Sequence, residues 1–150
     1  MADNVISTLN DLVETSKDGE HGFRTAAEDT KTAELRAVFL ARAEDCARGA
    51  ADLQHVISRL GGNPQERGSI AGAVHRGWVN LKAAATGRTD LAILEECERG
   101  EDVAKARYRK ALDEKLPDDI RSIVQRQYDA VLRNHDQVRN LRDRYRANAA

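Results

Sequence analysis

The sequence predicts an all-α protein, an antiparallel four-helix bundle, and three observations support this prediction. Apolar residues recur at alternating steps of three and four along most of the chain, which is the period of one helix face. Charged residues make up 33% of the 150 residues and aromatic residues only 4%, whereas a β-sandwich needs more aromatic and β-branched side chains. Capping and turn residues separate the periodic segments. At this length, one domain over residues 1–150 is expected.

The first two predicted helices form a hairpin. Residues 3–29 carry apolar side chains on one face, and Thr30 and Thr32 then offer caps for a second helix. Gly61 and Gly62 stop that helix, because paired glycines are typical of helix ends. The turn between the two helices is short, so they are expected to run antiparallel.

A crossover is predicted between the second and third long helices. Residues 63–68 form a loop, Ser69 can cap a short helix over residues 70–86, and Gly87 ends it. A helix of this length spans roughly 24 Å, which is enough to return along the bundle. Two hairpins joined by one long crossover is the ferritin-like connection. We therefore expect a ferritin-like layout with a short crossover helix between the second and third long helices.

The last two predicted helices form the second hairpin. Thr89 or Asp90 starts the third long helix, and the apolar period continues beyond it for about six turns. The final helix opens at residues 116–118, where proline is followed by acid in the first turn, and its inward face extends to Tyr145. Only residues 147–150 are expected to fray.

Composition excludes several functional classes. Lysine and arginine number 24 against 25 acidic residues, so no overall charge draws the chain to nucleic acid or an anionic membrane. No stretch approaches the roughly 20 apolar residues of a membrane span, and the cytoplasm is the expected location. Cys46 and Cys97 fall on apolar helix faces and are expected to be buried, reduced thiols.

Five residues that can bind metal fall near one level of the predicted bundle, roughly 13 to 19 Å from one end. They are Glu20, Asp45, Glu98, Glu101 and His135. Two-metal bundles take one glutamate from each of two helices and a Glu-x-x-His pair from each of the others. Glu20 and Glu101 fit the single-glutamate helices, and His135 fits one histidine. Iron or manganese suits this set of carboxylate and imidazole ligands.

The two-metal pattern is incomplete, which leaves two alternatives open. Leu132 stands three residues before His135, and Arg48 stands three residues after Asp45, where ligands are required. One alternative is a single, weaker metal site. The other is a buried ion-pair network in which Arg42, helped by Arg48, neutralises the inward glutamates.

The predicted crossover helix carries His75, Arg76 and Trp78. A tryptophan beside a cation and a histidine can mark a ligand or partner site. The alternative is packing, in which Trp78 anchors the crossover helix on the bundle and Gly77 permits close approach. The same surface is a candidate contact for a homo-oligomer.

Three short runs together carry a family resemblance: residues 17–23 (KDGEHGF), 75–78 (HRGW) and 95–102 (EECERGED). They resemble a bacterial family of four-helix-bundle proteins of unknown function that is grouped with the ferritin-like superfamily. The likeness covers nearly the whole chain and implies the bundle fold, without an assigned activity. The positions that it carries over as metal ligands are Glu20, Glu101 and His135.

The sequence supports two hypotheses about function. In the first, the mid-bundle carboxylates bind iron or manganese, in metal or oxidative-stress handling. In the second, the chain is a non-catalytic structural or interaction protein, and the same residues form ion pairs. Whether the protein is an enzyme stays open between them, and neither hypothesis involves nucleic acid or a membrane.

Overall fold

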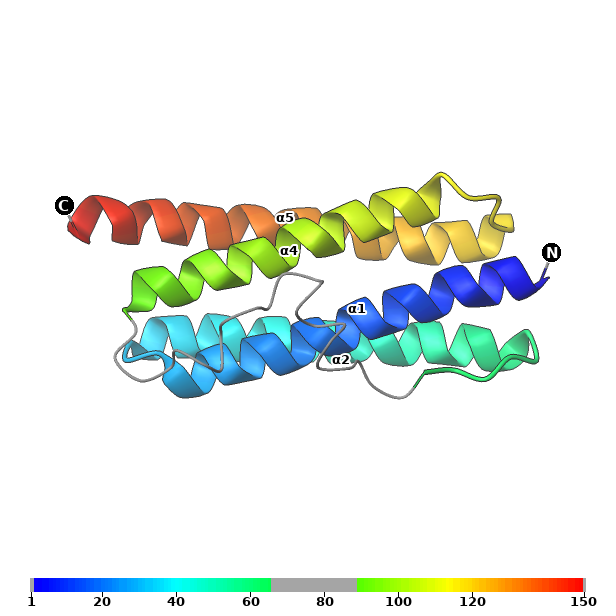
Figure 1. The fold of residues 1–150 in the computed structure, drawn as a ribbon, viewed down its shortest axis with the longest axis horizontal. Coiled ribbons are helices and arrows are strands. Elements are labelled where there is room, and N and C mark those ends of the chain that lie inside the picture. The colour runs from blue at the N-terminus through cyan, green and yellow to red at the C-terminus, as the bar shows by residue number, and fades with distance from the viewer. Residues whose placement is uncertain (1, 66–88, 150) are drawn as a thin grey trace.

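The computed structural model describes residues 2–65 and 89–149, and four helices account for most of them (Figure 1). The helices are α1 (Ala2–Asp29), α2 (Ala33–Arg59), α4 (Asp90–Leu112) and α5 (Asp118–Ala149). Neither range contains a strand, so the all-α prediction is confirmed for the described chain. The predicted crossover helix, residues 70–86, lies outside the described residues. None of the described helices combines the length and apolar character needed to cross a membrane.

The second helix ends where the paired glycines predicted. Gly61 adopts a φ of 81°, a conformation that glycine reaches without strain. The N–H groups of Gly61 and Gly62 each donate to a carbonyl in the last turn of α2, at 3.0 Å. At the other end of the chain, α5 continues to Ala149, through residues that we expected to fray.

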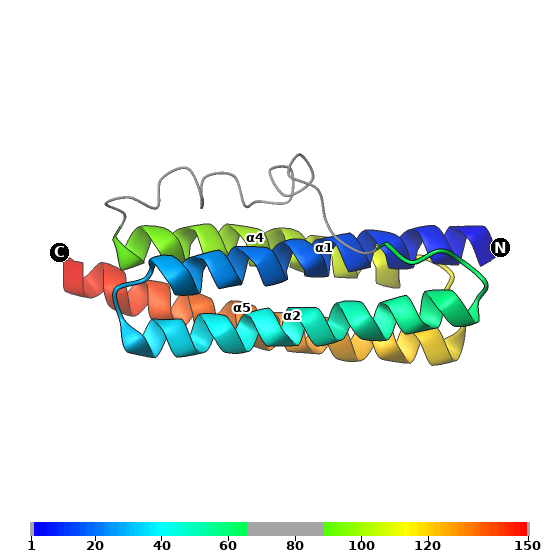
Figure 2. The ribbon, with the colours of Figure 1, turned by 90° about the horizontal axis from the view of Figure 1, so that it is seen from below.

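The four helices form two hairpins that pack side by side (Figures 1 and 2). In Figure 1, α1 runs from right to left and α2 returns, and α4 runs from left to right before α5 returns. Each hairpin is closely packed, and α1 also packs against α4. Contact between α2 and α5 is much sparser. The side of the bundle between α2 and α5 is therefore its most open side.

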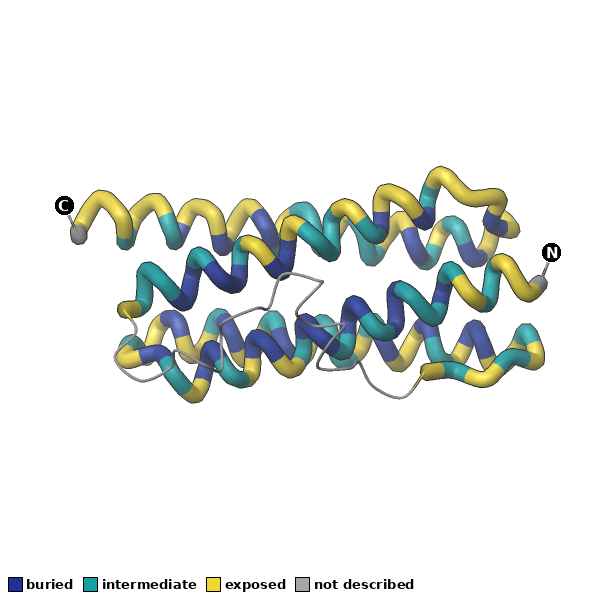
Figure 3. The backbone as a smooth tube through the Cα atoms, viewed as in Figure 1, coloured by how far each residue is buried: buried dark blue, intermediate teal, exposed yellow. Residues whose placement is uncertain are grey.

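Buried residues recur along all four helices (Figure 3), and the apolar ones form two clusters. One cluster, near the turn between α1 and α2, includes Phe23 and Phe39, and the other, toward the start of α1, includes Leu12 and Leu53. Burying each such side chain contributes about 1.5–3 kcal/mol, so the two clusters supply much of the stability. Between them, at the level of Ser16 on α1, the inner helix faces carry polar groups.

Asp90 joins the two hairpins at one end of the bundle. Its carboxylate accepts hydrogen bonds from Thr30 Oγ1 at 2.6 Å, from Thr32 Oγ1, and from the N–H of Lys31 at 3.2 Å. The prediction that the Thr30 and Thr32 side chains cap α2 is wrong in this respect: Thr32 is the N-cap residue but makes no side-chain capping bond. Thr89 does cap α4, and its Oγ1 accepts a backbone N–H at 3.1 Å.

Candidate functional site

A cavity of about 90 Å³, lined by both polar and apolar side chains, lies in the middle of the bundle, between the two apolar clusters. All four helices contribute to its wall. Its lining includes Ser16, Gly19, Arg42, Cys46, Gly49, Glu101, Tyr108, Gln127 and Asn134. The cavity can hold several water-sized groups, and polar side chains from all four helices reach its otherwise largely apolar wall.

One side of the cavity is a chain of hydrogen bonds that links the four helices. The hydroxyl groups of Ser16 and Tyr108 lie 3.3 Å apart, and Tyr108 donates to Gln127 Oε1 at 2.7 Å. Gln127 Nε2 in turn donates to the carbonyl oxygen of Gly49 at 3.1 Å. Burial raises the pKa of Tyr108 well above its usual range, so the phenol keeps its proton. These polar groups satisfy one another and hold the helices in place.

Glu101 differs from these polar groups, because one of its carboxyl oxygens forms no hydrogen bond in the described chain. The residue is only 5% exposed, and its Oε1 has no hydrogen-bond partner among the described residues. Burial raises the pKa of Glu101 to about 8; the Arg42 guanidinium opposes this, and the carboxylates of Asp102 and Asp45 add to it. At neutral pH, Glu101 is therefore mainly a neutral acid that can donate a proton in a hydrogen bond.

Glycines leave room in the cavity wall. A Cβ atom on Gly19 would lie 2.9 Å from Cys46 Sγ, so glycine permits α1 and α2 to approach closely here. A Cβ atom on Gly49 would be 3.7 Å from the side chain of Gln127, which is ordinary contact. Gly19 is therefore required by packing, whereas Gly49 is not.

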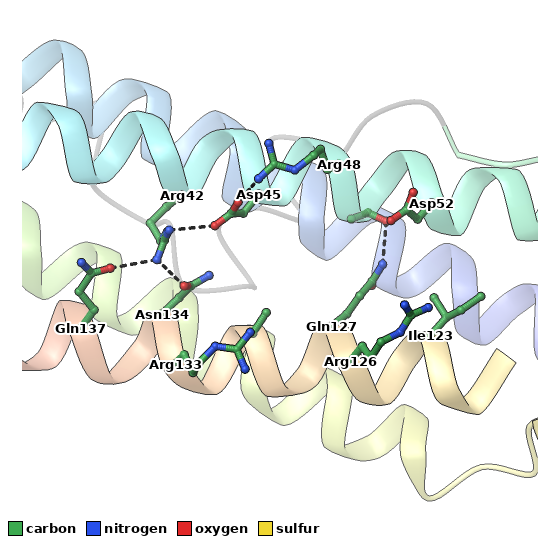
Figure 4. A pocket seen from close by; sticks show the side chains of 12 residues that line it. Arg42, Asp45, Arg48, Asp52, Ile123, Arg126, Gln127, Arg133, Asn134 and Gln137 are labelled. Atoms are coloured by element: carbon green, nitrogen blue, oxygen red, sulfur yellow. Dashed lines mark hydrogen bonds and ion pairs between the residues drawn. The ribbon is translucent and has the colours of Figure 1, made fainter. Parts of the chain in front are cut away.

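A groove of about 710 Å³ separates α2 from α5 and adjoins the cavity (Figure 4). Residues that line both spaces include Arg42, Gly49, Gln127 and Asn134. The groove therefore leads to the cavity from the side between α2 and α5, where the helices contact each other least.

Arginines dominate the charge of the groove. Arg42 and Arg48 come from α2 and Arg126 and Arg133 from α5, against two acidic residues in the same lining. Figure 4 shows Arg126 and Arg133 across the groove from Arg48. Arg126 and Arg133 form no ion pair with any residue that the structure describes. The groove is thus locally positive in a chain whose overall charge is −1.

Arg42 stands where the groove meets the cavity. Its Nη2 pairs with Asp45 Oδ2 at 2.9 Å, and its Nη1 donates to Gln137 Oε1 at 2.9 Å and to Asn134 Oδ1 (Figure 4). Its Nε is buried and has no hydrogen-bond partner within the described part of the chain. An arginine held by three side chains, with its buried Nε–H unbonded, is suited to receive a further acceptor.

Comparison with known families bears on this arrangement. Residues 4–114 match a family described as a domain of unknown function, DUF2383. The chain belongs to this family. No curated protein matches the chain. The DUF2383 match extends over α1, α2 and α4, including Arg42 and Glu101, whereas α5, which supplies Gln127, follows the matched residues. The predicted resemblance to a family of unknown function is therefore confirmed over residues 4–114.

Two of the predicted metal ligands of this DUF2383 member have cationic partners. Glu20 pairs with Arg24 at 2.9 Å and with Lys17 at 3.5 Å. Glu98 pairs with Arg142 of α5. A metal ion would have to replace these cations, since each carboxylate has its charge already balanced.

Two more of the predicted metal ligands, His135 and Asp45, also have side-chain partners. His135 is buried, and its Nε2 lies 2.6 Å from Asp102 Oδ1. Asp45 pairs with both Arg42 and Arg48. Across the described ranges, no three His, Cys, Asp or Glu side chains gather as metal ligands do. The side chains present therefore do not fit a two-metal centre.

The ion pairs differ from the network that we expected around Arg42. Arg42 pairs with Asp45, and no ion pair joins it to Glu20, Glu98 or Glu101 in the described chain. Among the described residues, these charged side chains instead form separate ion pairs, and Glu101 has no ion-pair partner. His75, Arg76 and Trp78, predicted to form a packing or partner surface, lie outside the described residues.

Sequence reasoning missed the cavity itself. The apolar period places Ser16, Tyr108 and Gln127 on inward helix faces, but it does not assign them to a site. The signal was present, because these polar side chains interrupt the apolar period of three different helices at similar heights. Cys46 and Cys97, predicted to be buried, reduced thiols, are both free; Cys97 is buried and Cys46 is half-buried, and desolvation raises the pKa of each well above the usual range.

Proposed function

We propose that this chain is a non-catalytic, ferritin-like binding protein, and that the groove between α2 and α5 receives a small anion bearing carboxylate or phosphate groups. The observation that carries the proposal is the pair Arg126 and Arg133, which face the groove without an ion-pair partner in the described chain. Guanidinium groups match carboxylate and phosphate oxygens in both charge and geometry.

The size and charge of the groove support this ligand class. Its volume of about 710 Å³ is within the range of small-molecule sites. Four arginines face two aspartates, Asp45 and Asp52, which leaves a local excess of positive charge. A small anion is favoured over nucleic acid because the positive region is confined to one groove of a chain with net charge −1.

The layout of the chain supports the ferritin-like part of the proposal. The hairpin of α1 and α2 is separated from the hairpin of α4 and α5 by residues 60–89, which is long enough for a crossover. The two hairpins also run in opposite senses along the bundle (Figure 1).

A non-catalytic role is supported by the protonation of the two thiols and by the ion pairs of two glutamates. Burial keeps Cys46 and Cys97 as thiols rather than nucleophilic thiolates. Glu20 and Glu98 are occupied by cations, which disfavours the iron or manganese role and supports the ion-pair interpretation. Homo-oligomer formation and a cytoplasmic location stay predictions.

Isothermal titration calorimetry with citrate, inorganic phosphate and sulfate, at constant ionic strength, tests this function. The wild-type chain is expected to bind citrate or phosphate saturably. The double variant Arg126→Gln, Arg133→Gln should lose affinity about tenfold or more, since both guanidinium contacts are removed.

The matched control is the double variant Arg139→Gln, Arg146→Gln. Both arginines lie on α5 outside the groove lining, so the variant makes the same change in net charge elsewhere. It should bind the anions as the wild type does. The proposal is wrong if none of the three anions binds saturably to the wild type, or if the two double variants lose affinity equally.

A further inference from the structure

We propose that the cavity behind the groove is a separate site for a short-chain monocarboxylate, whose carboxylate group lies between Arg42 Nε and the carboxyl group of Glu101. The inference deepens the proposed function, because the groove between α2 and α5 provides access to this cavity. It concerns a different and smaller space, so it can fail while anion binding in the groove stands.

Two polar atoms without partners carry the inference. Arg42 Nε and Glu101 Oε1 are both buried, and neither forms a hydrogen bond within the described chain. Both residues line the cavity. Leaving a buried polar group unsatisfied is costly, so an occupant that bonds to both atoms would stabilise the folded chain.

The chemistry of these two groups selects an acceptor. Arg42 Nε can only donate a hydrogen bond, and a neutral Glu101 carboxyl group donates through its O–H. A carboxylate offers two acceptor oxygens and a negative charge that the guanidinium favours. A cationic ligand is disfavoured, because Arg42 stands at the cavity wall and further arginines line the groove that leads to it.

The other walls limit the size of the ligand. Ser16, Tyr108 and Gln127 already bond to one another. Phe23 and Val131 add apolar surface that suits a short alkyl group. A cavity of about 150 Å³ binds benzene, so one of about 90 Å³ takes a ligand of about four non-hydrogen atoms. Acetate has this size, and propionate is one carbon larger.

The test is calorimetric titration with sodium acetate at constant ionic strength, with acetamide as a neutral control of the same size and methylammonium chloride as a smaller, cationic control. The wild type is expected to bind acetate saturably and at least tenfold more tightly than either control. If acetate does not bind saturably, the cavity holds water only and the inference is overturned.

Two variants at one position separate ligand binding from folding. Glu101→Gln keeps an N–H donor at the same place and should bind acetate within about tenfold of the wild type. Glu101→Leu removes the donor together with an unpaired buried acid, so the chain should stay folded but lose at least tenfold in acetate affinity. Equal affinity in the wild type and Glu101→Leu, with both shown to be folded by circular dichroism, would contradict the proposal.

The groove variant distinguishes this inference from the proposed function. Arg126→Gln, Arg133→Gln should weaken citrate or phosphate much more than acetate, because these arginines do not line the cavity. Binding of citrate or phosphate without binding of acetate would overturn the cavity site alone.

Discussion

Arg42 pairs with Asp45 at 2.9 Å, and Glu101, which lines the same cavity, has no ion-pair partner among the described residues. The arginine that could neutralise the buried acid is held by Asp45, Asn134 and Gln137 instead. Burial keeps Glu101 a neutral acid at neutral pH, and the buried Nε–H of Arg42 has no acceptor among the described residues.

Glu101→Gln should stabilise the protein at neutral and alkaline pH. The pKa of Glu101 is about 8 in the folded chain, against about 4.3 for an unfolded glutamate. Between these values only the folded chain holds the proton, so the free energy of unfolding falls as pH rises, by up to about 1.4 kcal/mol per pH unit. Glutamine removes this loss, and this slope between the two pKa values predicts a gain of roughly 4–5 kcal/mol at pH 8.

Urea unfolding at pH 5, 7 and 9 checks this prediction, with Glu44→Gln, an exposed change on α2, as the control. Parallel pH curves for Glu101→Gln and the wild type would contradict it.

The ionisable groups that act on Glu101 or interact with its neighbours are Glu20 on α1, Arg42, Asp45 and Cys46 on α2, Cys97 and Asp102 on α4, and His135 on α5.

Asp90→Ala should destabilise the bundle by about 2–3 kcal/mol, because the change removes charge-assisted hydrogen bonds. These bonds come from Thr30, Thr32 and the backbone of Lys31, and they join the hairpins. Burial alone would raise the pKa of Asp90, but the hydrogen bonds lower it overall. The stabilisation is therefore present above the unfolded pKa of about 3.9 and is lost as pH falls through the folded pKa.

Urea unfolding at pH 7 and pH 3 measures the Asp90 contribution. Asp119→Ala, at an exposed acid in the first turn of α5, is the control and should cost less than about 1 kcal/mol. A cost for Asp90→Ala no larger than that of the control would show that Asp90 does not join the hairpins.

Alanine at two glycines should have opposite effects. Gly19→Ala places a Cβ atom 2.9 Å from Cys46 Sγ and should destabilise by about 1–2 kcal/mol. Gly49→Ala makes only ordinary contacts and should stabilise by about 0.5–1 kcal/mol, since alanine favours the helix. Thermal unfolding of the two variants, and of Gly19→Ala combined with Cys46→Ala, checks this. The combination should recover part of the loss, and strict additivity would argue against the close contact.

Anaerobic loading with Fe(II) or Mn(II), followed by elemental analysis, should show no stoichiometric metal in the wild type or in Glu101→Ala. The reason is that Glu20 and Glu98 are already paired with Arg24 and Arg142. Stoichiometric metal in the wild type that is lost in Glu101→Ala would support the metal hypothesis instead.

The sequence predicted helix positions well because they depend on local signals. The apolar period fixes each inward face, and Gly61 supplies the left-handed conformation that ends α2. The ion pair between Glu20 and Arg24 could also be predicted from the sequence, because residues four apart are neighbours on a helix surface.

Contacts between residues far apart in the chain could not be predicted from the sequence. The partner of Glu98 is Arg142, 44 residues away, and this contact depends on how α4 and α5 rotate against each other. Likewise, Arg42 faces α5 rather than the inward glutamates, because the sparse packing of α2 on α5 leaves a groove into which its side chain extends. The cavity and groove therefore required the structure.

The most direct test of the proposed function is a citrate titration followed by two-dimensional ¹H–¹⁵N NMR of the full chain. The side-chain amides of Gln127, Asn134 and Gln137 lie along the groove and report on its occupancy. We expect these signals to shift saturably in the wild type and not in Arg126→Gln, Arg133→Gln. No saturable shift, or shifts confined to α1 and α4, would contradict binding between α2 and α5.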